Sequence, residues 1–191
     1  AEAYADGFGP EVPLCGWSVT KGALNALVGI QVGRGELALA DDHLLAEWQG
    51  DGRRRISVDH LLRMSSGLAF NEDPRSLGSD VVRMLFGRGD AAAYAAARPL
   101  VAAPGAQWAY ASGTSNILAR VLRERLPGDW ADYAAFPRRA LFDPLGMETA
   151  VLETDAAGTL AGSSFMYAGA RDWARLGQLY LQDGVWAGER I

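Results

Sequence analysis

Gly16-Trp17-Ser18-Val19-Thr20-Lys21 leads directly into the longest apolar run of this chain, Leu24 to Val32. The run predicts a helix over residues 18–32. Residues three apart lie on one face of a helix, so the hydroxyl of Ser18 and the amine of Lys21 are expected to meet. The predicted distance between the two groups is about 3–4 Å, which is hydrogen-bond reach.

A serine in contact with a lysine can form a nucleophile and its base. Serine is a weak nucleophile until a neighbouring group takes its proton. Lysine can take that proton only in its neutral form, which burial at a helix N-terminus favours. Among the 18 Lys and Arg residues, only Lys21 is a lysine, and an arginine could not replace it because a guanidinium does not deprotonate. The spacing alone is also compatible with an interpretation without function, in which a small residue begins a helix and is followed by a surface lysine.

The composition describes one globular domain of 191 residues, with 49% hydrophobic and 21% charged residues. A net charge of −5 argues against nucleic acid or an anionic membrane as a partner. A single cysteine, Cys15, excludes an internal disulfide. His43 and His60 have no metal-ligand spacing, so no metal or other cofactor is expected. No apolar run is long enough to span a membrane. We recognise no targeting segment in the sequence, so the sequence does not distinguish a cytoplasmic from a periplasmic location.

The rest of the chain is expected to be mostly helical. A remnant of a strand is expected at residues 1–5, followed by a Gly/Pro loop, and residues 149–166 have weak strand or loop character. Ser57 is a candidate helix cap. Helices are predicted at residues 41–48, 57–67, 80–86, 90–98, 112–126, 130–141 and 171–181.

Tyr110 is the third candidate site residue. It lies just before the helix predicted at residues 112–126, whose first residues are small and polar. A tyrosine at a helix N-terminus beside a cation can act as a base, which makes Tyr110 a candidate acid–base group. The alternative is a half-buried aromatic side chain with a purely structural role.

Taken in order, four segments resemble the serine hydrolases with a β-lactamase-like fold, among them class C β-lactamases, family VIII esterases and 6-aminohexanoate-dimer hydrolases. The segments are Gly16–Lys21 as the Ser-x-x-Lys motif, His60–Leu68 as the Leu-Leu-x-x-x-Ser-Gly-Leu segment, Pro104–Ser112 ending in the Tyr-x-Asn motif, and Leu141–Met147 as the Leu-x-x-Pro-Leu-Gly-Met segment. The ordered set is far more specific than any one motif.

The resemblance implies a mainly α chain, the helical part of a β-lactamase/penicillin-binding-protein-like α/β fold, forming a single partial domain over residues 1–191. It implies that Ser18 is the nucleophile and that Lys21 and Tyr110 handle protons, so Tyr110 is expected to face the same cleft as Ser18. It also implies that Ser112 and Trp17 contact substrate. Ser112 departs from the motif, because the family usually has asparagine at this position.

The family's third motif, Lys-Thr-Gly or His-x-Gly on a strand beyond the last helix, has no counterpart in this sequence. We therefore expect an internal fragment that lacks most of the β-sheet. It is expected to be catalytically silent although its parent is an enzyme. An unpaired sheet edge and an exposed apolar face would then favour self-association.

The leading functional hypothesis is an acyl-transfer hydrolase that cleaves a small-molecule amide or ester through an acyl-enzyme. The alternative is a non-catalytic binding or sensor domain with the same fold. A helical interaction protein would require the motif matches to be accidental. A Ser-His-Asp hydrolase is disfavoured because residues 16–20 lack the second glycine of Gly-x-Ser-x-Gly.

Overall fold

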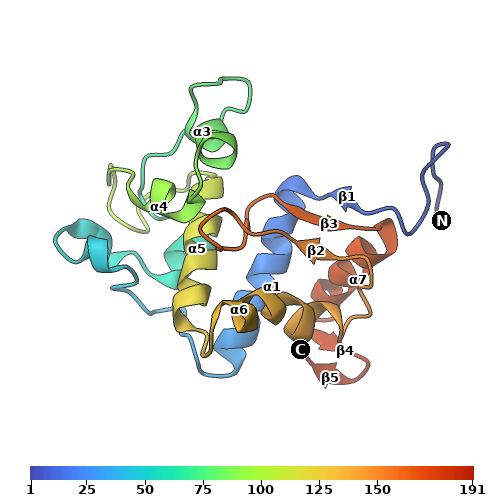
Figure 1. The fold of residues 1–191 in the computed structure, drawn as a ribbon. Helices are drawn as coiled ribbons and strands as arrows, with labels where there is room; N and C mark the ends of the chain where they lie inside the picture. Colours follow the sequence, from blue (N-terminus) through green and yellow to red (C-terminus); the bar gives the residue numbers. More distant parts are fainter.

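Seven helices and five short strands make up the structure, a computed structural model that describes residues 1–191 (Figure 1). The helices are α1 (Thr20–Gly33), α2 (Val58–Leu62), α3 (Asp80–Gly87), α4 (Ala91–Ala96), α5 (Ser112–Arg125), α6 (Trp130–Pro137) and α7 (Ala170–Leu181). The strands are β1 (Leu14–Cys15), β2 (Val151–Leu152), β3 (Met166–Ala168), β4 (Val185–Trp186) and β5 (Glu189–Arg190). The predicted excess of helix over strand is confirmed.

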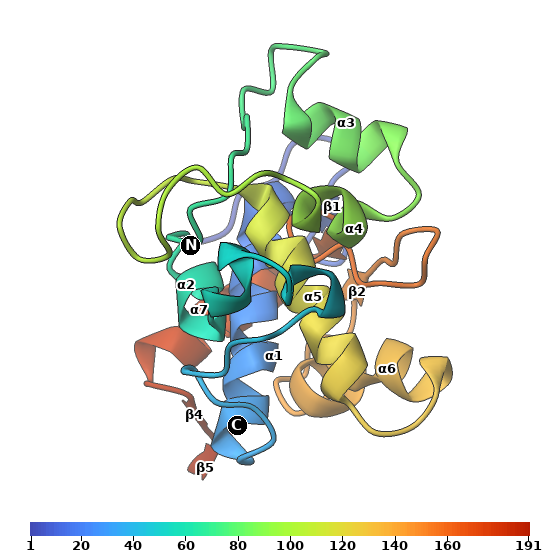
Figure 2. The same cartoon turned by 90° about the vertical axis from the view of Figure 1, so that its left-hand side faces the viewer.

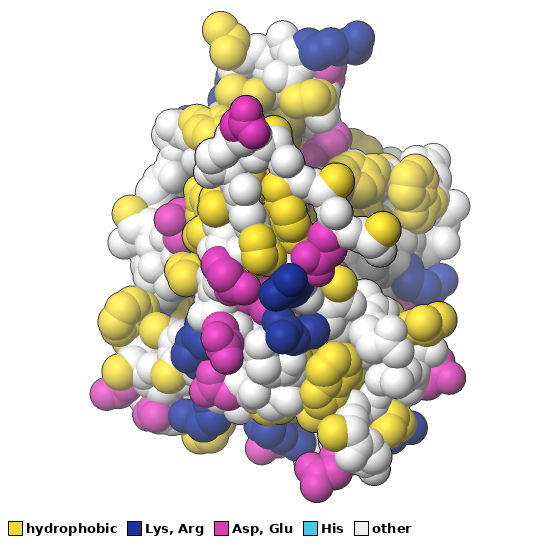
Figure 3. Space-filling view, turned by 90° about the vertical axis from the view of Figure 1, so that its right-hand side faces the viewer, with side chains coloured by type: hydrophobic (Ala, Val, Ile, Leu, Met, Phe, Trp, Pro, Cys, Tyr) yellow, Lys and Arg dark blue, Asp and Glu magenta, His cyan; other side chains and the backbone are white.

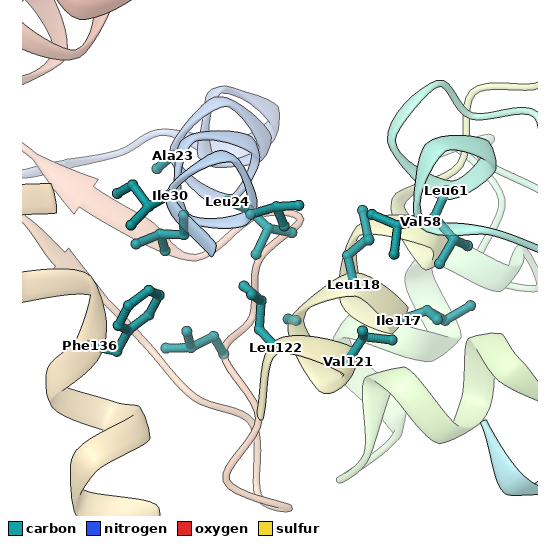
Figure 4. Close-up of a cluster of buried hydrophobic side chains, with 14 of the residues drawn as sticks. Ala23, Leu24, Ile30, Val58, Leu61, Ile117, Leu118, Val121, Leu122 and Phe136 are labelled. Carbon is teal, nitrogen blue, oxygen red and sulfur yellow. The ribbon is translucent and has the colours of Figure 1, made fainter. Parts of the chain in front are cut away.

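Helices α1 and α5 supply the centre of the hydrophobic core. Leu24 of α1 and Leu118 and Leu122 of α5 are almost completely buried. Figure 4 shows Phe136 of α6 beside the α1 residues and Leu61 of α2 on the far side of α5. Burying one such side chain contributes about 1.5–3 kcal/mol, so these contacts fix the position of α1 relative to α5.

A three-stranded antiparallel sheet lies on the other side of α1 from α5 (Figure 1 and Figure 2). Its strand order is β1-β3-β2, with Leu14 opposite Ala168 and Val151 opposite Tyr167. Helix α7 follows β3 directly, and the hairpin of β4 and β5 follows α7. The sheet matters for the site because its first strand ends one residue before the 3₁₀ turn that carries Ser18.

Polar side chains cap the first turns of several helices, and the sequence predicts one of these caps, Ser57. The predicted cap Ser57 accepts a hydrogen bond from the backbone of His60. The ring of His60 accepts one from the Ser57 backbone at 3.1 Å, which completes a capping box. Ser79, Asp90 and Asp129 cap α3, α4 and α6 in the same manner. The structure thus gives His60 a local structural contact that the sequence did not indicate.

The predicted strand at residues 1–5 is wrong. The segment has no regular structure and its residues are exposed. The strand that pairs with β3 is instead Leu14–Cys15, at the end of the expected Gly/Pro loop. A strand forms where a partner offers main-chain groups, and in this chain that partner is β3.

The predicted helix at residues 41–48 is also wrong, because only Ala46–Trp48 forms a 3₁₀ turn. The Asp41 side chain accepts a hydrogen bond from the Ala38 backbone, and its carbonyl accepts one from Val58. The helix predicted over residues 57–67 ends at Leu62, since Met64 has a φ of 55°. A positive φ does not continue an α-helix.

The surface is mixed in character. Figure 3 shows the face with the N-terminal segment and α7, where hydrophobic side chains lie among acidic and basic ones. Arg171 of α7 forms an ion pair with Glu2 on this face. None of the helices combines the length and the apolar composition that crossing a membrane requires.

The hydroxyl of Tyr133 provides a test of the core. It donates to the carbonyl of Ala119 at 2.9 Å and accepts from the backbone of Leu160 at 3.0 Å, and burial raises the pKa of the hydroxyl. We expect Tyr133→Phe to lower the free energy of unfolding by about 1–3 kcal/mol, because two buried main-chain groups lose their partner. Urea denaturation measures the change. Tyr4→Phe, in the exposed N-terminal segment, is the control, and equal loss in both variants would contradict the assignment.

Candidate active site

Ser18 lies at the junction between the small sheet and α1. It is the middle residue of the 3₁₀ turn Trp17–Val19, which runs directly into α1. The Gly16 backbone donates to the Met166 carbonyl at 2.8 Å, extending the pairing of β1 with β3 to the start of the turn. The Ser18 side chain is exposed. The prediction that Ser18 lies in the first turn of a helical segment is confirmed.

Gly16 has a steric reason for being glycine. A Cβ at this position would lie 2.3 Å from the ring of Trp173 in α7. Real Cβ atoms do not approach other atoms so closely, so the indole of Trp173 packs directly on the backbone that leads into Ser18. The first residues of α7 therefore help to hold the turn in place.

Lys21 lies one turn after Ser18 and its amine donates three hydrogen bonds. The Nζ atom is 3.1 Å from Ser18 Oγ, 3.1 Å from Ser112 Oγ and 2.8 Å from the carbonyl oxygen of Ser163. The amine thus connects α1, α5 and the segment that precedes β3. The predicted contact between the hydroxyl of Ser18 and the amine of Lys21 is confirmed, and the half-buried side chain is not the surface lysine of the alternative reading.

Tyr110 faces the same serine from a distant part of the sequence. Its hydroxyl donates to Ser18 Oγ at 2.7 Å, across a separation of 92 residues. Its ring centroid lies 5.1 Å from Lys21 Nζ, which is within range of a cation–π contact. The predicted common location of Tyr110 and Ser18 is confirmed.

Main-chain hydrogen bonds hold the loop that carries Tyr110. The Ala109 backbone donates to the Met64 carbonyl at 2.9 Å, and the Gly105 backbone donates to the Ser65 carbonyl at 2.7 Å. The segment that includes Met64 and Ser65 therefore positions Tyr110 through its backbone. The sequence identified this segment as a motif but gave no physical reason for it.

Ser112 is the first residue of α5 and is 2% exposed. Besides accepting from Lys21, it donates twice to the carboxylate of Glu72. Its backbone N–H is 2.8 Å from Oε2, and its hydroxyl donates to Oε1 at 2.5 Å. Glu72 could not be predicted as a site residue, because a single glutamate in a polar loop 40 residues from Ser112 carries no recognisable signal.

Ser163 owes its position to Asn116 of α5. The Asn116 amide donates to Ser163 Oγ at 3.1 Å and accepts from the Ser163 backbone at 3.3 Å. Both residues are buried. This pair fixes the carbonyl that accepts from Lys21, and it too was missed, because its contribution is a main-chain oxygen.

An aromatic row lies beside Ser18. The ring of Trp17 packs edge-on against Phe165, with centroids 6.0 Å apart, and Phe165 lies 6.0 Å from Phe86. Trp17 is 54% exposed and has a φ of 45°, in the left-handed region. Such backbone strain costs about 1–3 kcal/mol and is concentrated at functional sites.

The fold resembles several solved hydrolase structures. The comparison with a protein described as a 6-aminohexanoate-dimer hydrolase, from Bacillus anthracis, gives a TM-score of 0.79 at 21% identity, over 100% of this chain and 53% of that one. A D-stereospecific amidohydrolase from Streptomyces sp. gives 0.69 at 18%, over 93% and 63%. A class C β-lactamase from Rhodobacter sphaeroides gives 0.68 at 15%, over 94% and 54%. The chain thus spans little more than half the length of most of these relatives.

These likenesses show the β-lactamase-like fold that the motifs implied. No curated protein sequence matches the chain. The family model described as Beta-lactamase matches residues 13–189, which includes Ser18, Lys21, Tyr110 and Ser112. Because that match covers most of its length, the chain belongs to the β-lactamase family of hydrolase-related proteins.

Proposed function

We propose that this chain carries the nucleophile and the proton-transfer groups of a serine hydrolase that cleaves a small-molecule amide or ester. The observation that supports the proposal is the convergence of two titratable groups on one hydroxyl. The amine of Lys21 and the hydroxyl of Tyr110 lie 3.1 and 2.7 Å from Ser18 Oγ. Both distances lie within the reach that proton transfer requires.

The hydrogen bonds of Lys21 suit both protonation states of its amine. As an ammonium, the group donates one N–H to each of its three acceptors. As a neutral amine, it keeps two N–H donors for Ser112 and the Ser163 carbonyl, and its lone pair points to the Ser18 hydroxyl. The neutral form can thus accept the Ser18 proton without any movement of the side chain.

The reaction would proceed in two stages. Ser18 Oγ attacks the carbonyl carbon and passes its proton to Lys21. The leaving amine or alcohol departs with a proton supplied through Tyr110, and an acyl-Ser18 ester remains. Water then attacks this ester, gives up a proton to the same groups and releases the acid. The Ser18 backbone N–H, at the start of a helical segment, would supply part of the oxyanion hole.

Trp17 is proposed to contact the apolar part of the substrate. Its exposed indole adjoins the nucleophile and continues into Phe165 and Phe86. Aromatic surface of this kind favours an apolar group over a charged one. Ser112 is buried and fully engaged with Lys21 and Glu72, so we assign it to the support of Lys21 rather than to substrate contact.

The first prediction concerns acylation of Ser18. A fluorophosphonate probe should label the chain at Ser18 with loss of fluoride, because the hydroxyl is exposed and lies beside its base. Lys21→Arg should slow labelling by at least about 10²-fold, since the charge is kept but no proton can be accepted. Peptide mass spectrometry locates the adduct. Ser76→Ala, in an exposed loop, is the matched control for Ser18→Ala, and labelling that survives Ser18→Ala would disprove the nucleophile.

The second prediction concerns Tyr110. In a form of the protein that turns over a chromogenic ester or lactam, Tyr110→Phe should lower kcat by about 10²–10⁴-fold, the usual range for an acid–base group. The phenyl ring keeps the packing against Lys21, so the loss would come from the hydroxyl. Tyr4→Phe should have wild-type turnover. An unchanged kcat in Tyr110→Phe would remove this residue from the mechanism.

The third prediction separates turnover from acylation. The family's third motif has no match within residues 1–191, so we expect the 191-residue chain to turn over substrate at least about 10²–10³-fold more slowly than a longer form that supplies it. A chromogenic assay on both forms measures the ratio. Equal rates would show that the chain needs no third motif. Acylation of the longer form without release would favour the alternative of a non-catalytic binding or sensor domain.

A further inference from the structure

The carboxylate of Glu72 accepts both hydrogen bonds that Ser112 can donate. One comes from the backbone N–H and one from the hydroxyl. Helix α5 begins at Ser112, and its N-cap residue, Ala111, has no side-chain cap of its own. Glu72 thus occupies the place of a cap, although it comes from a different part of the chain.

The loop that carries Glu72 is itself fixed. The Asn71 backbone donates to the Asp80 side chain at 2.8 Å, and the Asn71 carbonyl accepts from the Val81 backbone at 3.1 Å. Tyr94 and Arg98 in turn donate to Asp80 at 2.6 and 3.1 Å. The Glu72 carboxylate is therefore held on a supported stretch of backbone rather than on a free loop.

The direction of the hydrogen bonds has a chemical consequence. A serine hydroxyl has one proton, and in Ser112 that proton goes to Glu72. The oxygen of Ser112 can then only accept from Lys21, at 3.1 Å. The third contact of the amine, the Ser163 carbonyl, is also an acceptor only. Ser18, Ser112 and the Ser163 carbonyl surround the Lys21 amine. When the amine is neutral, only the Ser18 hydroxyl among them can donate a hydrogen bond to its lone pair.

We infer that Glu72 is a positioning residue: it fixes Ser112 as an acceptor and thereby directs the lone pair of Lys21 toward Ser18. This inference rests on the proposed function. It also accounts for the serine at position 112. The family that the sequence resembles usually has asparagine at this position. The carbonyl oxygen of an asparagine can accept from Lys21 by itself, whereas a serine hydroxyl is held as an acceptor only if a second group takes its proton.

Glu72→Gln tests the inference with little change in shape. The amide has one acceptor oxygen in place of two, so either the backbone or the hydroxyl of Ser112 loses its acceptor. A freed hydroxyl can donate to Lys21 and compete with Ser18. We expect fluorophosphonate labelling of Ser18 to slow by about 10–100-fold, the usual effect of losing a group that orients a reactive one. Asp73→Asn is the matched control, because this neighbouring carboxylate pairs with Arg75 and does not contact Ser112.

Rescue distinguishes this role from simple capping of α5. The side-chain oxygen of asparagine carries no proton, so in a Ser112→Asn variant it can accept from Lys21 without help from Glu72. Adding Glu72→Gln to this variant should therefore change the labelling rate by less than about 2-fold. A double-mutant cycle measures this difference. A cap that acts only on stability would give no rescue, and the rate loss would follow the loss of thermal stability. Wild-type labelling in Glu72→Gln, or equal loss in Asp73→Asn, would overturn the inference.

A spectroscopic measurement keeps the inference separate from the proposed function. Lys21 is the only lysine, so ¹³C-lysine labelling gives one Cε signal that needs no assignment. At fixed pH this signal should move in Glu72→Gln and stay in place in Asp73→Asn. If the fluorophosphonate probe does not react with Ser18 in the unmodified chain, the proposed function fails. The shift of the Lys21 Cε signal would still report the contacts between Glu72, Ser112 and Lys21. An unmoved signal in Glu72→Gln would overturn the inference itself.

Discussion

The contacts of one half-buried amine organise the centre of this molecule. Burying a cation is costly unless its donors find acceptors, and Lys21 satisfies all three of its N–H groups within 3.1 Å. Those acceptors lie on the turn before α1, at the start of α5 and just before β3. The same hydrogen bonds that arrange the proposed reaction therefore also link these three elements, in addition to the hydrophobic contacts between α1 and α5.

Each acceptor of Lys21 is supported by a second contact. Asn116 binds the backbone N–H and the hydroxyl of Ser163, Glu72 accepts from Ser112, and the Trp173 ring packs on the backbone before Ser18. Such outer contacts restrict the motion of groups that need a narrow range of geometry. Because α7 supplies Trp173, an element near the other end of the sequence takes part in the placement of the nucleophile.

Local rules were enough to predict some parts of the site and not others. The contact between the hydroxyl of Ser18 and the amine of Lys21 follows from helical spacing, and the position of Tyr110 followed from the order of the motifs. Glu72 could not be found, because its link to Ser112 depends on how a loop folds back on the chain. The start of α2 was predicted because Ser57 caps it. The helix predicted from Asp41 does not form, because the Asp41 side chain accepts from the Ala38 backbone instead of capping a helix. The two-residue strands β1, β4 and β5 were missed because only their partners define them.

The loop of Tyr110 shows how this geometry can outlast changes in sequence. Its anchors, between Ala109 and Met64 and between Gly105 and Ser65, are bonds from backbone to backbone. Such bonds do not depend on which side chain stands at Ala109, so mutations could accumulate there over evolution without moving the tyrosine. A chain held together in this way can diverge widely while its architecture persists, as the relative with a TM-score of 0.79 and 21% identity illustrates.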